Sequence, residues 1–178
     1  MSERVLQGHH LDTNFKSEEL LRFPNDLYTQ LKKDFPRNQV NLMRQAYTFA
    51  SKAHDGQERM DGKPYISHPL EVARILVEMN MDVDSICAGL MHDVLEDCNI
   101  EKRNIDKIFG KDVSEIVDGV SKIGKLDFQS KAERDINSFQ KMALAMAKDV
   151  RVIVVKLADR LHNMSCLLYT SDAADDRV

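Results

Sequence analysis

The sequence contains few of the residues that interrupt helices. Of its 178 residues only 4 are proline and 7 are glycine. Hydrophobic residues make up 43% and charged residues 30% of the chain, which excludes a protein that is disordered throughout. Apolar residues mostly recur at intervals of three and four, the spacing of one helix face. The sequence therefore predicts a mainly helical domain with a sizeable core.

Long apolar runs and a surplus of basic residues are also absent. No run reaches the roughly 18 residues that a membrane-spanning helix needs, and the start, MSERVLQGHHLD, has no apolar secretory core. The net charge of −4 argues against a protein that coats nucleic acid, although a local basic cluster can still bind a small anion. We therefore expect no membrane segment and no direct binding of nucleic acid.

Cysteine is scarce as well. Cys87, Cys98 and Cys166 form no CxxC pair, and three residues cannot all pair with one another. This usage is typical of a reducing compartment, so we expect a cytoplasmic protein.

Periodicity and helix-start residues predict where the helices lie. Expected helices cover 17–34 with a break at Pro24, 38–53, 67–80 with Ser67 as its cap, about 82–97, 101–109, 112–118, 137–148 and 151–164. Residues 54–66 and 119–135 are expected to be connections. The helix over 151–164 is expected to be buried, with Ile153, Leu157 and Leu161 on one side.

This pattern divides the chain into three parts. Residues 1–37 are a leader and a first helix, residues 38–164 are the main domain, and residues 165–178 do not continue its pattern. The last part, SCLLYTSDAADDRV, resembles a translated adapter-like tail, and we interpret it as an artefact. A short natural tail is the alternative.

Four polar motifs stand out from the helical pattern: HDGQER at 54–59, SHP at 67–69, HDVLED at 92–97 and ADRLHN at 158–163. Residues three and four apart share one face of a helix. On a continuous helix, His92 and Asp93 would therefore be followed one turn later by Glu96 and Asp97. Burying such groups is costly unless they are paired or bind a metal.

The histidines and aspartates of these motifs suit a metal site. Imidazole nitrogens together with carboxylate oxygens favour Mn, Fe, Zn or a similar divalent ion. The candidate ligands are His68, His92, Asp93 and Asp159. A metal there would lower the pKa of a bound water and polarise a phosphoryl oxygen. Glu96 and Asp97 are then expected to orient that water or accept its proton.

Each motif also has an ordinary structural explanation. A lone His-Asp pair is common, and His68 is at a position that often only starts a helix. Asp159 has Lys156 and Arg160 nearby for an ion pair, and the charged residues of 59–63 fit a solvated loop. The conjunction of His, then His-Asp, then Asp on an otherwise helical chain is what favours a metal site.

That order of motifs is the pattern of the HD phosphohydrolase superfamily. The match extends further: AHDGQERMDGKPYISHPLEVARIL, GLMHDVLEDC, FGKDVSEIVDGVSKIGKL and VRVIVVKLADRLHNM closely resemble the hydrolase domain of RelA/SpoT-type alarmone enzymes. The resemblance covers roughly residues 42–164 and is specific, because four motifs agree in order and spacing. It implies an all-α HD-domain helical bundle in a bacterial enzyme. Such an enzyme uses one Mn²⁺ to remove the 3′-pyrophosphate of (p)ppGpp in the stringent response, releasing GDP or GTP.

The resemblance also implies a role for each motif. The family's metal ligands fall on His68, His92, Asp93 and Asp159, and its activating carboxylates fall on Glu96 and Asp97. Its substrate-binding residues fall on Arg59 and Asn163. The planar fork of Arg59 suits a purine face or a phosphate. Further candidates for phosphate contacts are Lys63, Lys122, Lys125 and Lys156.

The chain departs from the family at two points. The position after Arg59 is often basic in the family and is Met60 here. After Met164 the family usually continues with an Arg-Thr pair and further helices that close the pocket, whereas this chain has Ser165 and Cys166. Members that only synthesise the alarmone lose the His-Asp and Glu-Asp motifs. Both motifs are present here, so a hydrolase is indicated.

Long members of the family also carry synthetase and regulatory domains, so a bifunctional parent protein is one interpretation of this sequence. Two alternatives to the assigned activity remain open. Another HD-type phosphohydrolase, acting on dinucleotide cofactors or dNTPs, is the nearest rival in activity. The second rival is a module that binds metal or nucleotide without turnover.

Overall fold

The computed structural model describes residues 23–124 and 148–175. Within these ranges the regular structure is helical, and extended pairing is limited to an isolated bridge between Glu58 and Pro64. The helices are α2 (Asn25–Asp34), α3 (Arg37–Ala53), α4 (Ser67–Glu78), α5 (Val83–Leu90), α6 (Val94–Asp97), α7 (Lys102–Phe109), α8 (Lys111–Gly124) and α10 (Arg151–Asp175). The all-α prediction is confirmed. None of these helices is long and apolar enough to cross a membrane.

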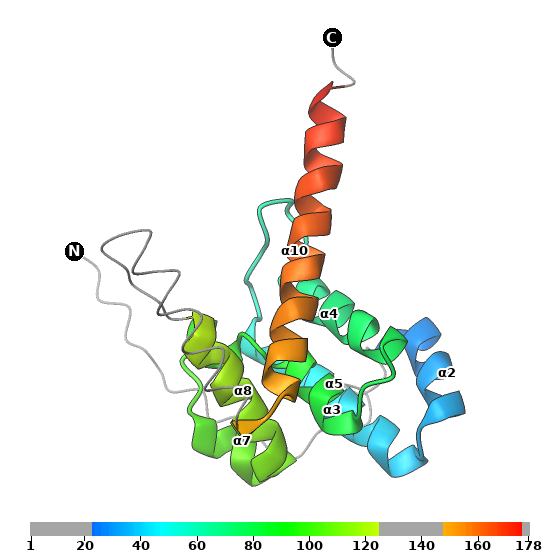
Figure 1. The fold of residues 1–178 in the computed structure, drawn as a ribbon, viewed down its shortest axis with the longest axis vertical. Helices are drawn as coiled ribbons and strands as arrows, with labels where there is room; N and C mark the ends of the chain where they lie inside the picture. Colours follow the sequence, from blue (N-terminus) through cyan, green and yellow to red (C-terminus); the bar gives the residue numbers. More distant parts are fainter. Residues whose placement is uncertain (1–22, 125–147, 176–178) are drawn as a thin grey trace, which may run out of the picture.

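Helix α5 is the centre of the bundle. Every residue from Ser85 to Leu90 is buried, because α5 packs against α3, α4, α8 and α10. A short helix that is apolar on all sides is typical of such a position. Figure 1 shows α10 running across the other helices and extending beyond them at its C-terminal end. The turn that follows α5 therefore starts from a fixed point in the core.

The expected helix over residues 82–97 is wrong, because α5 ends at Leu90. Its start is as predicted: the Ser85 N–H donates to Oδ1 of Asp82 at 2.8 Å. At its other end the carbonyl of Gly89 accepts a hydrogen bond from Nδ1 of His92 at 2.8 Å. A helix would use that carbonyl for the N–H four residues on. The chain instead turns through residues 91–93 and re-enters a helix as α6.

Gly89 also sets the distance between α4 and α5. A methyl group at this position would collide with Cδ1 of Leu76 and lie 3.6 Å from Cγ1 of Val72, both on α4. Leu76 and Val72 are themselves fully buried. A larger residue at position 89 would therefore have to displace the buried side chain of Leu76.

Two further local predictions are wrong. Ser67 does not cap α4: it is the first helical residue, and Ile66 precedes it without a capping side chain. Of the expected apolar face of α10, Ile153 is buried, whereas Leu157 and Leu161 are each 57% exposed. The face that packs carries Val152, Val155 and Ala158, because that face meets α4, α5 and α8.

The other predicted bounds of helices and loops are partly confirmed. The helices over 38–53 and 101–109 and the loop over 54–66 are confirmed, and the helix expected over 112–118 extends to Gly124. Of the first predicted helix, α2 begins at Asn25, just after Pro24. Residues 17–22, 125–135 and 137–147 lie outside the described part of the chain. The boundary expected after Met164 falls inside α10, and both domain boundaries stay predictions.

Candidate metal centre

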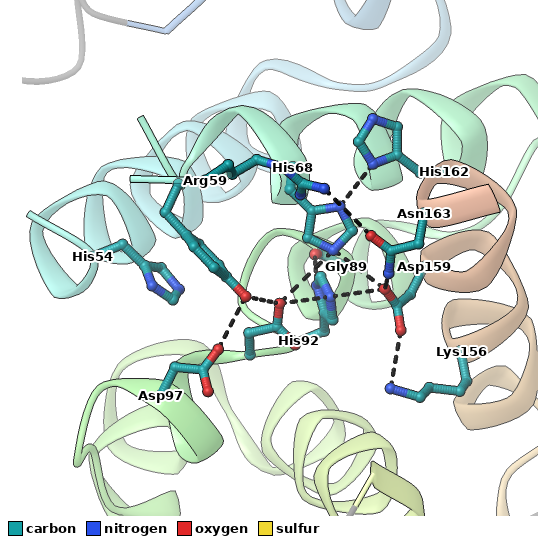
Figure 2. A network of polar contacts seen from close by, with 12 residues as sticks. His54, Arg59, His68, Gly89, His92, Asp97, Lys156, Asp159, His162 and Asn163 are labelled. Atoms are coloured by element: carbon teal, nitrogen blue, oxygen red, sulfur yellow. Dashed lines mark hydrogen bonds and ion pairs between the residues drawn. The ribbon is translucent and has the colours of Figure 1, made fainter. Parts of the chain in front are cut away.

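Three separate segments meet beside the end of α5. His68 lies in the first turn of α4, His92 and Asp93 lie in the turn between α5 and α6, and Asp159 lies in α10. Figure 2 shows the side chains of His68, His92 and Asp159 turned toward one another. Their candidate ligand atoms all lie within 4.8 Å of each other, and all three residues are buried. The fold thus brings together the four residues predicted as metal ligands.

Both imidazoles face both carboxylates through their Nε2 atoms. Oδ1 of Asp159 lies 3.2 Å from Nε2 of His68 and 3.7 Å from Nε2 of His92. Oδ2 of Asp93 lies 3.0 Å from Nε2 of His92 and 3.8 Å from Nε2 of His68. The other oxygen of Asp159 binds Nζ of Lys156 at 2.9 Å, so the ion pair foreseen as an alternative coexists with the cluster.

The burial and the neighbours of His92 indicate whether these residues fit a cation. The ring is fully buried, and its Nδ1 donates to the carbonyl of Gly89, which leaves Nε2 facing Asp93 and Asp159. Within the described residues this Nε2 makes no hydrogen bond, although Oδ2 of Asp93 lies 3.0 Å away as an ion-pair partner. A buried polar atom without a hydrogen bond costs about 1–3 kcal/mol. A divalent cation between imidazole and carboxylate ligands would satisfy it, so the donor set fits such an ion.

The charges of the cluster favour a cation as well. Burial disfavours a charged imidazolium, yet the carboxylates of Asp159 and Asp93 outweigh burial and raise the pKa of His92 to about 10. Burial would raise the pKa of each carboxyl, but the imidazoles hold the pKa of Asp93 and of Asp159 below its ordinary value. Two ionised carboxylates thus face one buried pocket of nitrogen ligands, where a cation and a proton compete.

A tyrosine connects this cluster to the predicted activating pair. The hydroxyl of Tyr65 lies 2.8 Å from Oδ2 of Asp93 and 2.9 Å from Oδ2 of Asp97. Burial, and then the charge of Asp93, raise the pKa of Tyr65, so the phenol keeps its proton and donates it. The sequence reasoning missed Tyr65, because a tyrosine in a loop carries no signal beyond its place three residues before His68.

Glu96, the other member of the pair, is half-buried at the edge of the cluster. Burial raises the pKa of its carboxyl; the charges of Asp93 and Asp97 add to this, and Lys156 opposes it. Its Oε1 is buried without a hydrogen-bond partner among the described residues. A carboxylate with a raised pKa and a free lone pair is suited to accept a proton.

The residues predicted to bind substrate differ in where they lie. Nη2 of Arg59 donates to Oδ1 of Asn163 at 3.4 Å, and Nδ2 of Asn163 donates to Oδ1 of Asp159 at 2.7 Å (Figure 2). The two side chains therefore extend the cluster toward the loop before α4. Lys63 is 70% exposed and pairs with Asp61 at 3.2 Å.

Two other lysines were candidates for phosphate contacts. Nζ of Lys122 binds Asp118 at 2.6 Å, with its side chain 72% exposed. Lys125 lies outside the described residues. The structure therefore gives no support for a phosphate contact at Lys122, and the contact at Lys125 stays a prediction.

Two further histidines lie close by. Nδ1 of His54 donates to Oε1 of Gln57 at 2.8 Å, so this histidine bonds within its own loop. Nδ1 of His162 lies 2.7 Å from Nδ1 of His68. Burial and the charges of His68 and Arg59 lower the pKa of His162. The sequence reasoning assigned His162 no role, although it lies beside two residues of the same motif.

Comparison with known proteins adds a family and relatives. The HD domain family matches residues 46–178. The chain is 51% identical over 129 residues to a guanosine-3′,5′-bis(diphosphate) 3′-pyrophosphohydrolase of Vibrio cholerae, covering 72% of this chain and 18% of that protein. It is 49% identical over 132 residues to the bifunctional (p)ppGpp synthase/hydrolase SpoT of Escherichia coli K12, covering 74% and 19%. The chain thus spans about a fifth of the length of these curated relatives.

A solved structure is also similar. It is described as a metazoan ortholog of SpoT that hydrolyses ppGpp and plays a role in starvation responses. The match has a TM-score of 0.60 and 29% sequence identity, and it covers 76% of this chain and 73% of that one.

Proposed function

This chain belongs to the HD domain family, and we propose that it is the hydrolase unit of an enzyme that removes the 3′-pyrophosphate of (p)ppGpp. The substrate is inferred from relatives whose names state this activity, since about half of the matched residues are identical. The single observation that carries the proposal is the buried Nε2 of His92, which makes no hydrogen bond within the described residues and faces two carboxylates and a second imidazole. Such a site fits a metal-dependent hydrolase.

The proposed ligands are His68, His92, Asp93 and Asp159, and the proposed ion is Mn²⁺. Mixed nitrogen and oxygen donors suit Mn²⁺ among other divalent ions, and the family resemblance favours it. When bound, such an ion neutralises phosphate charge and makes water a better nucleophile at neutral pH. The ionised state of the two aspartates, held by the imidazoles, supports cation binding.

The reaction needs a base and a positioned phosphate. Water adds its oxygen to the phosphorus that is bonded to the ribose 3′-oxygen, and that bond breaks. A carboxylate takes the water proton and returns it to the departing 3′-oxygen, which becomes the hydroxyl of GDP or GTP, with pyrophosphate as the second product. We assign the proton acceptor to Glu96 and Asp97. The raised pKa of Glu96 and its free Oε1 support this assignment.

The substrate contacts are proposed for Arg59 and Asn163, with Lys63 as an outer phosphate contact. Arg59 offers a planar cation beside the cluster, and Asn163 joins it to Asp159. Lys63 lies on the exposed side of the same loop and would exchange Asp61 for a phosphate. The loop before α4 and helix α10 would then bind opposite parts of the nucleotide.

We further propose a bacterial, cytoplasmic setting and a longer parent protein. Both curated relatives are bacterial, and none of the three cysteines forms a disulfide in the described part of the chain, as expected in a reducing compartment. Since one relative is named as a bifunctional synthase/hydrolase and the match covers only 19% of it, the parent would carry synthetase and regulatory domains.

An assay of four nucleotide classes tests the proposal. The purified chain is incubated with ppGpp, pppGpp, NADPH or dNTPs, in Mn²⁺ or in EDTA, and products are separated by anion exchange. We expect GDP or GTP and pyrophosphate only from the guanosine alarmones and only with Mn²⁺, with Asp159→Ala as the inactive control. Cleavage of another nucleotide while ppGpp stays intact would show that the substrate is wrong.

The rival without turnover needs a second measurement. Metal uptake and a thermal shift with Mn²⁺, but no hydrolysis, would support a binding module. Repeating the assay on the longer parent protein then locates the missing activity. If the parent hydrolyses ppGpp, turnover requires segments beyond this chain, whereas an inactive parent rejects the proposed function.

A further inference from the structure

We propose that His162 is a positioning residue for the metal centre: its ring accepts a hydrogen bond from His68 and thereby fixes which nitrogen of His68 faces the cation. This inference rests on the proposed function, because it assumes that His68 is a metal ligand. It adds a residue outside the predicted ligand, catalytic and substrate-binding sets. Figure 2 shows His162 above His68 and joined to it by a dashed line, with Asp159 on the lower side of His68.

The geometry at His68 divides its two ring nitrogens between two tasks. Nε2 faces the cluster, 3.2 Å from Oδ1 of Asp159. Nδ1 lies 2.7 Å from Nδ1 of His162, and the two rings are stacked with centroids 4.9 Å apart. The side chain of His68 is only 3% exposed, so water does not readily replace His162 as the partner of Nδ1.

A neutral imidazole carries its proton on one nitrogen only. His68 can bind a cation through Nε2 only if the proton is on Nδ1. Because that Nδ1 contacts Nδ1 of His162, the latter must accept, and the proton of His162 must then be on its Nε2. Sγ of Cys166 lies 3.6 Å from that Nε2, one turn further along α10, and suits a weak acceptor there.

The other histidine of the cluster is fixed in a different way. Nδ1 of His92 donates to the backbone carbonyl of Gly89, a group that only accepts. The tautomer of His92 is thus set by the main chain, whereas that of His68 depends on a side chain that can donate or accept. Partners of this kind that orient metal-binding histidines change metal affinity by about 10- to 100-fold when removed.

Two substitutions at the same position separate packing from hydrogen bonding. His162→Phe keeps an aromatic ring against His68 but removes the acceptor. His162→Asn places an acceptor oxygen near the position of Nδ1 and removes the ring. Leu161→Ala is the matched control, because Leu161 is the preceding residue of α10 and is 57% exposed. Thermal unfolding of each variant verifies that it is folded.

The primary readout is Mn²⁺ affinity of the full chain, from calorimetry and from the electron paramagnetic resonance signal of free Mn²⁺. We expect about 10- to 100-fold weaker binding for His162→Phe, binding within about threefold of wild type for His162→Asn, and no change for Leu161→Ala. In protein loaded with diamagnetic Zn²⁺ in place of Mn²⁺, ¹⁵N NMR should find the His68 proton on Nδ1 and the His162 proton on Nε2.

Each other outcome overturns a defined part of the inference. If His162→Phe binds Mn²⁺ like wild type, or if His162→Asn loses as much affinity as His162→Phe, then His162 does not act as an acceptor for His68. A His68 proton found on Nε2 rejects the assignment even if no variant folds. If the wild-type chain takes up no Mn²⁺, the proposed function fails first, and the role of His162 fails with it.

Discussion

Replacing Gly89 by alanine tests whether one residue both packs the core and holds the cluster. On helix propensity alone, alanine in a helix should stabilise the protein by about 1 kcal/mol. The structure predicts the opposite, because the added methyl group would overlap Cδ1 of Leu76. Leu76 is fully buried and Val72 lies close on the same side, so the leucine has little room to move.

The magnitude follows from setting these two effects against each other. Overpacking a well-filled core costs about 1–3 kcal/mol. After the propensity gain of about 1 kcal/mol, Gly89→Ala should lower the free energy of unfolding by about 1 kcal/mol. In a domain of this size that lowers the melting temperature by about 2–4 °C. The carbonyl of Gly89 shifts with the helix, so the hydrogen bond from Nδ1 of His92 suffers, and Mn²⁺ should bind about tenfold more weakly.

A double-mutant cycle with Leu76→Ala identifies the cause. Leu76→Ala alone leaves a cavity and costs about 2–5 kcal/mol. In that background the methyl group at position 89 has space, so Gly89→Ala should become neutral or stabilising, with a coupling of at least about 1 kcal/mol. Urea unfolding of the four proteins measures the cycle. Additive effects, or a more stable Gly89→Ala protein, would refute the steric argument.

Three more predictions concern single residues. Asp159→Ala should abolish Mn²⁺ uptake and hydrolysis together; metal analysis that finds wild-type occupancy would reject this ligand assignment. Glu96→Gln should keep Mn²⁺ affinity within about threefold and lower the rate of hydrolysis by at least about 100-fold, since proton acceptance is lost; an unchanged rate would exclude the catalytic role. Asp82→Ala should cost about 1 kcal/mol of stability at pH 7, the usual value of a helix cap. Although burial opposes it, hydrogen bonds from Ser85 and Arg151 lower the pKa of Asp82 below 3.8. The contribution of Asp82 to the free energy of unfolding is therefore present above pH 3.8 and disappears as the pH falls through the lowered pKa. Denaturant unfolding should therefore find a large difference in stability between wild type and Asp82→Ala at pH 7 and a small one at pH 2.

The candidate ligands were predictable because their chemistry lies in residue type and order. His68, His92 and Asp93 carry the donors that a divalent ion prefers, whatever the details of the backbone between them. That they meet Asp159 followed from the family resemblance, since periodicity alone says nothing of which helices touch. The fold confirms that the four residues come together.

The break after α5 was missed for a reason that lies within the same motif. Residues 82–97 have the apolar spacing of one continuous helix. His92, however, donates through its side chain to the carbonyl of Gly89, and this local bond competes with the helical ladder. Spacing rules count apolar residues and give no weight to such a competitor.

The orientation of α10 shows a second limit. Two apolar faces exist along its first turns, one with Leu157 and Leu161 and the other with Val152 and Val155. Helical periodicity is satisfied by either choice. The packing decides: a side chain added at Gly119 of α8 would meet Cγ2 of Val152 at 2.8 Å, so the second face fits closely against α8. Partner geometry of this kind is not encoded in one helix alone.

Because Asp159 lies in α10, a bound cation would link α10 to the rest of the bundle. His68 and His92 are anchored on α4 and at the end of α5, while Asp159 comes from a helix that is far along the chain. An ion held by all three would act as a crosslink that exists only while α10 is docked. Its binding energy then adds to the folded state, by about 2.7 kcal/mol when the free ion is at 100 times its dissociation constant. The supply of metal in the cell would therefore affect the stability of the folded chain as well as the proposed hydrolysis.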